Sequence, residues 1–107
     1  MADCIFCKII SKEQSCDIVH ESQELMAFKD INPKAPVHIL IVPKKHIATV
    51  NDLADADKEL IGDMVLEAKN IAKDQGIDAG YKLMFNVGRV GGQIIDHMHL
   101  HIMGGWQ

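Results

Sequence analysis

The pattern of apolar and polar residues predicts a short helix, three strands and a loop before Pro43. Residues 5–12 mix apolar and polar side chains as a short helix does. Residues 17–20 and 25–29 predict the two strands of a hairpin, with a turn at residues 21–24. Residues 30–36 predict a loop, because two prolines within four residues exclude both helix and inner strand. Residues 37–42 are a β-rich run that Pro43 ends.

One long helix is predicted over residues 55–75. Gly76 stands where a C-terminal cap is expected, and apolar residues recur at the 3.6-residue period of a helix that faces a core. These are Leu60, Ile61, Met64, Ala68, Ile71 and Ala72. Four acidic residues near its start suit the positive end of the helix dipole, so we interpret them as helix-start chemistry rather than a metal site. They are Asp52, Asp55, Asp57 and Glu59.

The C-terminal third continues with a strand over residues 81–87 and a flexible loop over residues 88–92. In residues 97–102 histidine then alternates with large apolar residues. On a strand this spacing lines three imidazoles along one face at about 6.6 Å intervals and turns the apolar residues to the core. About five strands with one long and one short helix predict an antiparallel α+β fold in a single domain over residues 1–107.

Composition narrows the function classes. With 48% hydrophobic residues the chain can bury a core, and its formal net charge of −4 argues against a nucleic-acid-binding surface. A small anionic ligand is not excluded, because backbone amides and imidazoles hold phosphate without net positive charge. We expect no export signal and no membrane span. Three cysteines are an odd count that favours a metal or reactive role over disulfides, so we expect a cytoplasmic protein.

The histidine triplet is the strongest chemical signal in the chain. Neutral imidazole can be a nucleophile, a proton carrier or a metal ligand near neutral pH. Three of the six histidines fall within residues 97–101, whereas a solvated strand face usually carries Thr, Lys or Glu. His38 alternates with apolar residues in the 37–42 strand. A lone strand histidine is most often a hydrogen-bonded core residue, but a neighbouring strand would let His38 orient one imidazole of the triplet.

Cys4 and Cys7 form a Cys-x-x-Cys pair at the start of the chain. Two thiolates at this spacing can close on one zinc ion, which then needs two further ligands. His46 and one histidine of the triplet are the natural candidates. A redox pair is the alternative, but that motif normally follows a strand, and almost nothing precedes it here. We therefore favour zinc.

A glycine-rich segment, residues 86–93, lies immediately before the triplet. Glycine lets backbone amides approach an anion closely, and Asn86 and Gln93 offer amide donors. A bare turn between strands would use the same glycines. The position beside three imidazoles favours a phosphate-holding loop.

The histidine triplet, closed by Gly104-Gly105, resembles the signature of the histidine triad superfamily, in the branch of nucleotide-binding proteins that hydrolyse nucleoside phosphoramidates. Residues 5–10, 27–33 and 35–47 are similar to the family's opening, its ribose-binding loop and its central strand. The resemblance thus covers nearly the whole chain. It implies a two-fold homodimer and a purine nucleotide or nucleoside phosphoramidate as ligand.

The resemblance also implies roles for individual residues. His99 would attack an α-phosphorus and form a nucleotidyl-histidine that water hydrolyses, which divides one hard displacement into two easier ones. His101 would contact the phosphate and His38 would help to orient the nucleophile. Asp30 would bind the ribose hydroxyls. The base pocket would consist of Ile5, Phe6, Ile9, Phe28, Ile31 and Leu40. The phosphate would be held by Asn86, Gly92 and Gln93. In cysteine-containing members zinc is held at positions matching Cys4, Cys7, His46 and His97.

Two departures from the family pattern bear on activity. Many members have serine at the position of Ile94, and longer relatives extend beyond the position of Gln107. Histidine rather than glutamine at position 101 favours hydrolysis over nucleotidyl transfer. For His97 to serve zinc while its neighbours serve phosphate, the backbone must twist or bend between them.

Two rival functions remain open from the sequence. In one, a zinc hydrolase would use all three triplet histidines as metal ligands that activate water, although same-face strand positions are too widely spaced for this to be easy. In the other, the chain would be a nucleotide-binding or regulatory module without catalysis, a reading to which Ile94 gives weight.

Overall fold

A computed structural model describes residues 4–107 of the chain. The predicted lack of an export signal rests largely on residues 1–3, which lie outside the described residues. None of the helices described is both long and apolar enough to cross a membrane.

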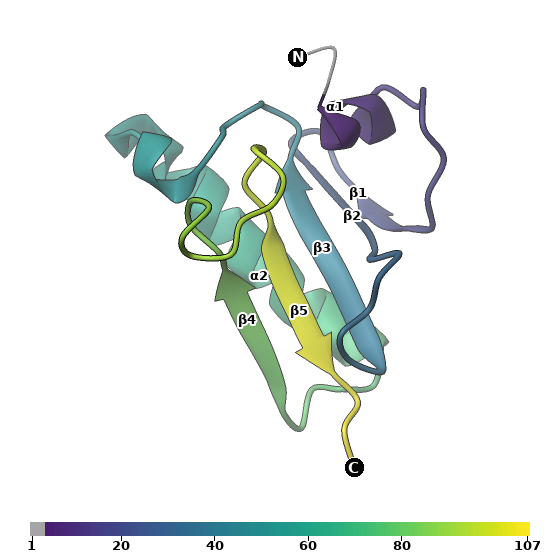
Figure 1. Cartoon of the computed structure of the whole chain (residues 1–107). Coiled ribbons are helices and arrows are strands. Elements are labelled where there is room, and N and C mark those ends of the chain that lie inside the picture. The colour runs from purple at the N-terminus through teal and green to yellow at the C-terminus, as the bar shows by residue number, and fades with distance from the viewer. Residues whose placement is uncertain (1–3) are drawn as a thin grey trace.

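Five strands of the described chain form one antiparallel sheet, and a long helix covers one of its faces (Figure 1). The strands lie side by side in the order β1-β2-β3-β5-β4. They are β1 (Ile18–Glu21), β2 (Leu25–Lys29), β3 (Val37–Pro43), β4 (Tyr81–Phe85) and β5 (Leu100–Gly104). The helices are α1 (Ile5–Ile10) and α2 (Lys58–Asp74), with single 3-10 turns η1 (Val50–Asp52) and η2 (Asp55–Asp57) before α2. The predicted α+β fold is confirmed.

The two faces of the sheet carry different cores, because alternate strand residues point to opposite sides. Toward α2 the strands present residues such as Ala27, Ile41 and Leu100. The predicted helix stripe meets them with Leu60, Met64, Ala68, Ile71 and Ala72, while Ile61 is half-buried at the margin. The opposite face carries Met26, Phe28, Leu40 and Val42, against which α1 packs Phe6 and Ile9. The functional side chains described below lie on this α1 side of the sheet.

Of the acidic residues predicted as helix-start groups, Asp52 and Asp57 cap the 3-10 turns η1 and η2, and Glu59 lies in the first turn of α2. Asp57 accepts from the Ala54 backbone N–H at 2.9 Å and from Lys45 Nζ at 3.0 Å. The Asp57 N–H also donates to the Ala54 carbonyl at 2.9 Å, which closes residues 55–57 into a 3-10 turn, so α2 begins three residues later than the pattern predicted. At the other end Gly76 adopts φ +73°, the left-handed conformation that ends many helices.

The prediction that the whole triplet lies on a strand is wrong. β5 begins only at Leu100, so of the three histidines only His101 belongs to the sheet. Residues 95–97 bend, which supplies the change of direction that separate roles require. The alternation of buried Met98, Leu100 and Ile102 survives because any extended backbone alternates its side chains, with or without a strand partner.

Candidate functional site

The three histidines of the triplet have three different sets of partners. His97 donates from Nε2 to the Pro43 carbonyl at 2.7 Å, and its Nδ1 faces the thiols of α1. His99 donates from Nδ1 to the His97 carbonyl at 2.8 Å. His101 pairs through Nδ1 with His38 at 2.8 Å. The equal spacing in sequence therefore does not produce one convergent group of ligands.

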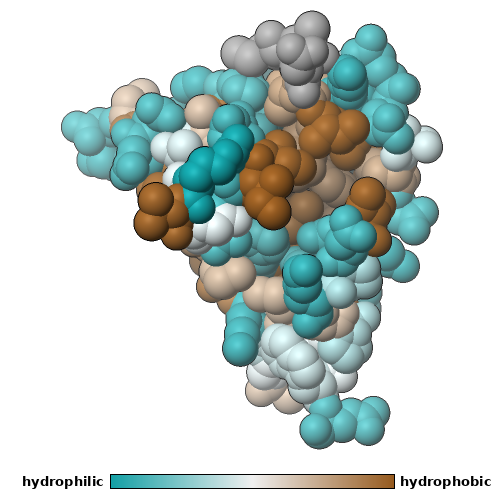
Figure 2. Space-filling view, in the orientation of Figure 1, coloured by the Kyte–Doolittle hydropathy of each residue, from teal (hydrophilic) through white to brown (hydrophobic). Residues whose placement is uncertain are grey.

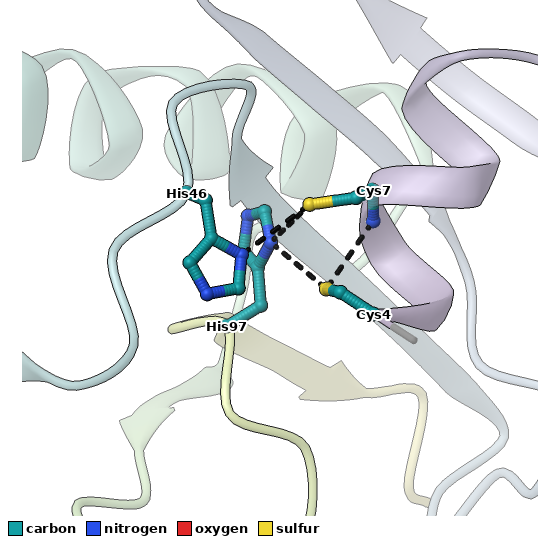
Figure 3. A group of neighbouring side chains, drawn as sticks. All are labelled: Cys4, Cys7, His46 and His97. Atoms are coloured by element: carbon teal, nitrogen blue, oxygen red, sulfur yellow. Dashed lines mark hydrogen bonds between the residues drawn. The ribbon is translucent and has the colours of Figure 1, made fainter. Parts of the chain in front are cut away.

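A cluster of two thiols and two imidazoles gathers at the N-terminal end of α1. Figure 3 shows Cys4, Cys7, His46 and His97 pointing toward a common centre. Their ligand atoms all lie within 4.8 Å of one another. Cys7 Sγ is 3.3 Å from His46 Nδ1 and 3.6 Å from His97 Nδ1, and Cys4 Sγ is 3.4 Å from His97 Nδ1. The four residues predicted as metal ligands are thus brought together and could hold a metal ion.

The donor set fits a tetrahedral ion. Bonds of about 2.3 Å to sulfur and about 2.0 Å to nitrogen place those ligand atoms about 3.5 Å apart. The hydrogen bond from His97 Nε2 to Pro43 leaves the lone pair on Nδ1, the atom that faces the thiols. Burial and the adjacent Cys4 raise the pKa of Cys7 to about 11, so the Cys7 thiolate needs a cation to offset its charge near pH 7.

His99 is placed as a nucleophile. Its Nδ1–H bond to the His97 carbonyl fixes the tautomer and leaves Nε2 unprotonated. The ring is buried and packs edge-on against Phe6 of α1, with ring centroids 5.1 Å apart. Burial lowers the pKa of His99 below its ordinary value, so the ring stays neutral near pH 7. A neutral imidazole with a free lone pair can attack an electrophilic phosphorus.

His38 and His101 meet beside His99, as the pairing of β3 with β5 dictates. Leu40 pairs with His101, so His38 lies two positions along the same face. Their rings and that of His99 form a contiguous row, with centroids 5.1 Å and 4.9 Å apart. Asp30 Oδ2 approaches His38 Nε2 to 3.5 Å. Burial and its two histidine neighbours lower the pKa of His101 to about 4.

A cavity of about 360 Å³ opens on this face, a size suited to a small ligand. Its lining is largely apolar and also includes His99, His101 and Asp30. Figure 2 shows the most hydrophobic side chains of this face gathered beside α1 and the loop before β5. The lining contains these predicted nucleotide-binding residues: Ile5, Phe6, Ile9, Phe28, Asp30, Ile31, Leu40, Asn86, Gly92, His99 and His101.

Gln93 does not reach the cavity, and its predicted phosphate contact is not supported. The residue is only 1% exposed. Its Nε2 donates to the carbonyls of Ala48 at 2.7 Å and Ile95 at 2.8 Å, while Oε1 accepts from the Gly88 N–H at 2.9 Å. Because both polar atoms of its amide already have partners, Gln93 stabilises the loop and does not contact a ligand in the cavity.

The glycine-rich loop also differs from the expected cradle of backbone amides. The N–H groups of Gly91, Gly92 and Gln93 all donate to carbonyls within the turn, at 2.9–3.1 Å. Gly92 still lines the cavity, with φ +93°, a conformation that favours glycine. It contributes by leaving the wall without a side chain, and Asn86 beside it supplies the amide.

Several cavity residues escaped the sequence reasoning. Lys34 stands between two prolines, and its positive charge is the sequence feature that could have assigned it to a phosphate site. Cys16 lies in the cavity wall, whereas an isolated thiol carries no such signal in sequence. The remaining additions are Gln14, Ser15, Lys29, Asn32 and Ile95, and Ile94, which the family pattern had already singled out, also lines the cavity.

Comparison with known proteins identifies relatives along nearly the entire chain. A family model described as "Scavenger mRNA decapping enzyme C-term binding" matches residues 3–105. Protein HitA of Neisseria gonorrhoeae is 45% identical over 104 residues, which are 97% of this chain and 97% of that protein.

Solved structures show the same fold at high identity. A HIT family hydrolase from Legionella pneumophila Philadelphia 1 is 48% identical and superposes with a TM-score of 0.96, covering 98% of this chain and 95% of that one. A histidine triad protein from Clostridium difficile is 40% identical, with a TM-score of 0.96 over 100% of this chain and 94% of that one.

Proposed function

The chain belongs to the histidine triad superfamily, and from that premise we propose that it hydrolyses purine nucleoside 5′-phosphoramidates or related nucleoside 5′-phosphate conjugates. One observation carries the proposal. The 2.8 Å bond from His99 Nδ1 to the His97 carbonyl leaves an unprotonated Nε2 on a buried ring in the cavity wall. The named hydrolase among the structural neighbours supports the reaction class.

The proposed reaction has two displacements at one phosphorus. His99 Nε2 attacks the α-phosphorus, the bond from phosphorus to the leaving amine breaks, and the amine departs with a proton taken from solvent. Water then attacks the nucleotidyl-histidine, releasing nucleoside 5′-monophosphate and restoring the neutral imidazole. Covalent catalysis of this kind replaces one difficult step by two easier ones.

The cavity offers each part of such a substrate a matching surface. The apolar wall that includes Phe6, Phe28 and Leu40 suits a purine base. The Asp30 carboxylate, whose Oδ1 already accepts from the Asn32 N–H at 2.9 Å, suits ribose hydroxyls. We assign the phosphate to the part of the lining that includes His99, His101, Asn86 and Gly92.

Hydrolysis of adenosine 5′-phosphoramidate by the purified protein tests the proposal. We expect adenosine monophosphate and ammonia as products, and an adenylylated protein in acid-quenched samples by intact mass spectrometry. His99→Ala should lose both signals. His20→Ala is the matched control, since that imidazole instead bonds Glu67 of α2 at 2.6 Å. Absence of turnover in the natural protein, with tight binding of adenosine monophosphate, would favour the non-catalytic module.

We further propose that Cys4, Cys7, His46 and His97 hold a structural zinc ion. Four protein ligands leave no open coordination position for substrate, so the bound ion would supply a cross-link and no Lewis-acid chemistry. Neither of the two possible metal-holding groups within residues 4–107 contains more than one histidine of the triplet. This arrangement speaks against the rival zinc hydrolase, in which all three would converge on one ion.

The proposed assembly is a two-fold homodimer of single-domain chains in the reducing cytoplasm. All three cysteines are free, which suits a reducing compartment. β4 lies at the edge of the sheet, and its Leu83 and Met84 are exposed, as is Leu66 of α2. Sedimentation analysis should give a dimer. Leu83→Glu near the middle of β4 should yield monomers through like-charge repulsion, whereas Val90→Glu in the exposed loop should not.

A further inference from the structure

The loop between β2 and β3 aims a backbone amide at the row of imidazoles. The N–H of Lys34 donates to His38 Nδ1 at 2.9 Å. A backbone N–H can only donate, so His38 Nδ1 can only accept. The neutral His38 ring must therefore carry its proton on Nε2, the atom that faces His101. His38 is buried, so water does not compete for these positions.

The direction of donation passes from His38 to His101. Their 2.8 Å contact joins His38 Nε2 to His101 Nδ1, and since His38 Nε2 bears the proton, His101 Nδ1 accepts. The proton of neutral His101 then lies on Nε2. Of the buried side-chain nitrogens and oxygens in residues 4–107, this atom is the one without a hydrogen-bond partner. The ring lines the cavity next to His99, so a ligand can provide the missing acceptor.

We propose that the Lys34 backbone amide is a positioning group of the active site: through His38, it holds the Nε2–H of neutral His101 as a fixed hydrogen-bond donor to a phosphoryl oxygen of the bound nucleotide. The inference rests on the proposed function, because it assigns the acceptor to the substrate phosphate. A donor that is already oriented needs no reorganisation when charge develops on that oxygen.

The opposite polarity conflicts with the observed geometry. If His101 donated from Nδ1, His38 Nε2 would accept and the His38 proton would move to Nδ1. Two N–H groups would then face each other across the 2.9 Å contact with Lys34. In that arrangement the lone pair of His101 Nε2 would also face the phosphate, and the negatively charged phosphoryl oxygens would repel it. Burial lowers the pKa of His101 to about 4, so near pH 7 the ring is neutral and carries a proton on only one of its two nitrogens.

The local sequence explains why this amide stays in place. Pro33 and Pro36 fix their own φ angles and restrict the residues before them. The Asp30 N–H donates to the His38 carbonyl at 3.0 Å and closes the base of the loop. Asp30 Oδ1 also accepts from the Asn32 N–H at 2.9 Å. The proline pair thus has a use beyond ending a strand, because it holds the donor that sets the histidine tautomers.

Nitrogen NMR of the imidazole rings tests the inference directly on the natural protein. Long-range proton–nitrogen correlations distinguish protonated from unprotonated ring nitrogens. We expect Nε2–H in both His38 and His101, with and without bound adenosine monophosphate. A proton on His101 Nδ1 in the free protein would overturn the proposal, and this measurement requires no variant to fold.

Two substitutions at one position separate the amide from the side chain. Lys34→Pro removes the N–H, whereas Lys34→Ala keeps it and removes only the amine. We expect Lys34→Ala to retain the Nε2–H tautomers, and Lys34→Pro to mix the tautomers of both rings and to bind adenosine monophosphate on the order of tenfold more weakly than Lys34→Ala. Unmixed tautomers in folded Lys34→Pro would contradict the relay. Because neither readout requires turnover, a protein with these tautomers but no hydrolysis would refute the proposed function alone.

Discussion

Disrupting the proposed zinc site should loosen α1 and weaken nucleotide binding without abolishing hydrolysis. Cys7→Ser takes one thiolate from the group that ties α1 to His46 and His97. The helix spans only Ile5–Ile10, far below the length of about 12 residues at which isolated helices become marginal. Its attachment to the sheet therefore decides whether it is ordered.

The magnitude follows from the groups that α1 buries. Ordering six residues costs about 6–12 kcal/mol in backbone entropy. Burial of Phe6 and Ile9 returns about 5 kcal/mol. The three backbone bonds donated by Lys8, Ser11 and Lys12 add about 2 kcal/mol. Without the cross-link these terms leave ordered α1 between about 1 kcal/mol favourable and about 5 kcal/mol unfavourable. A shortfall of about 1.4 kcal/mol, which lies within that range, would leave about one chain in ten with an ordered α1.

Apparent affinity falls by the fraction of chains that are competent to bind. Because α1 supplies part of the base pocket, we expect the dissociation constant for adenosine monophosphate to rise about tenfold in metal-free Cys7→Ser. Titration calorimetry measures this rise. Hydrogen exchange should show lost protection in α1 and retained protection in β3 and β5. Turnover at saturating substrate should persist, whereas a catalytic zinc would make it disappear.

Cys16→Ser is the control, since it also removes a thiol but lies outside the metal-holding group. It should keep the metal, the protection of α1 and the thermal stability of the natural chain. A Cys7→Ser protein that lacks zinc by elemental analysis, yet keeps both the α1 protection and the nucleotide affinity of the natural chain, would refute this role of the metal.

Three further outcomes are expected. Gly91→Ala places a Cβ 2.3 Å from the Val87 carbonyl oxygen, so the loop must shift. Urea denaturation should show that the free energy of unfolding falls by about 1–3 kcal/mol. Gly62→Ala is the control, because its Cβ meets nothing within 4 Å and should slightly raise the free energy of unfolding. Gln93→Leu leaves buried backbone groups unpaired and should cost about 2–4 kcal/mol in the same assay. The pKa of His101 is lowered to about 4 in the folded protein from about 6.5 in the unfolded chain. The contribution of neutral His101 to stability is therefore complete above pH 6.5 and is lost as the pH falls toward 4. The difference in unfolding free energy between the natural protein and His101→Gln should change by about 2 kcal/mol across that window.

The sheet could be predicted from sequence because alternation and turn residues act locally. Residues 25–29 and 37–42 fall on β2 and β3 within one residue, and the hairpin turn lies where it was expected. The same reasoning placed Gly76 at the end of α2. In each case the physical cause is one segment's own burial pattern or backbone conformation. Features with such local causes can be predicted without knowledge of the rest of the chain.

The differences from the expected phosphate loop concern groups whose hydrogen bonds are already taken within the fold. Gln93 has the right chemistry for phosphate and the right neighbours in sequence. Its amide is nevertheless taken by the Ala48 carbonyl, 45 residues away in the chain. The glycine loop supplied amides in principle, but its turn consumes them internally. A list of donors in sequence cannot show which are already paired, because pairing is settled by how the chain folds.

The triplet is the clearest case of this dependence. From the sequence alone the three imidazoles are equivalent. Each neutral imidazole, however, has one ring nitrogen that donates a hydrogen bond and one that offers a lone pair. The choice between them is made by what the other nitrogen meets: the Pro43 carbonyl for His97, the His97 carbonyl for His99 and the Nε2–H of His38 for His101. Each partner forces a different outcome, namely a metal-facing lone pair, a nucleophilic lone pair and an N–H donor. The chemistry of the site therefore depends on the Pro43 carbonyl and His38, which lie outside the motif, and on the backbone of His97, as much as on the three imidazoles themselves.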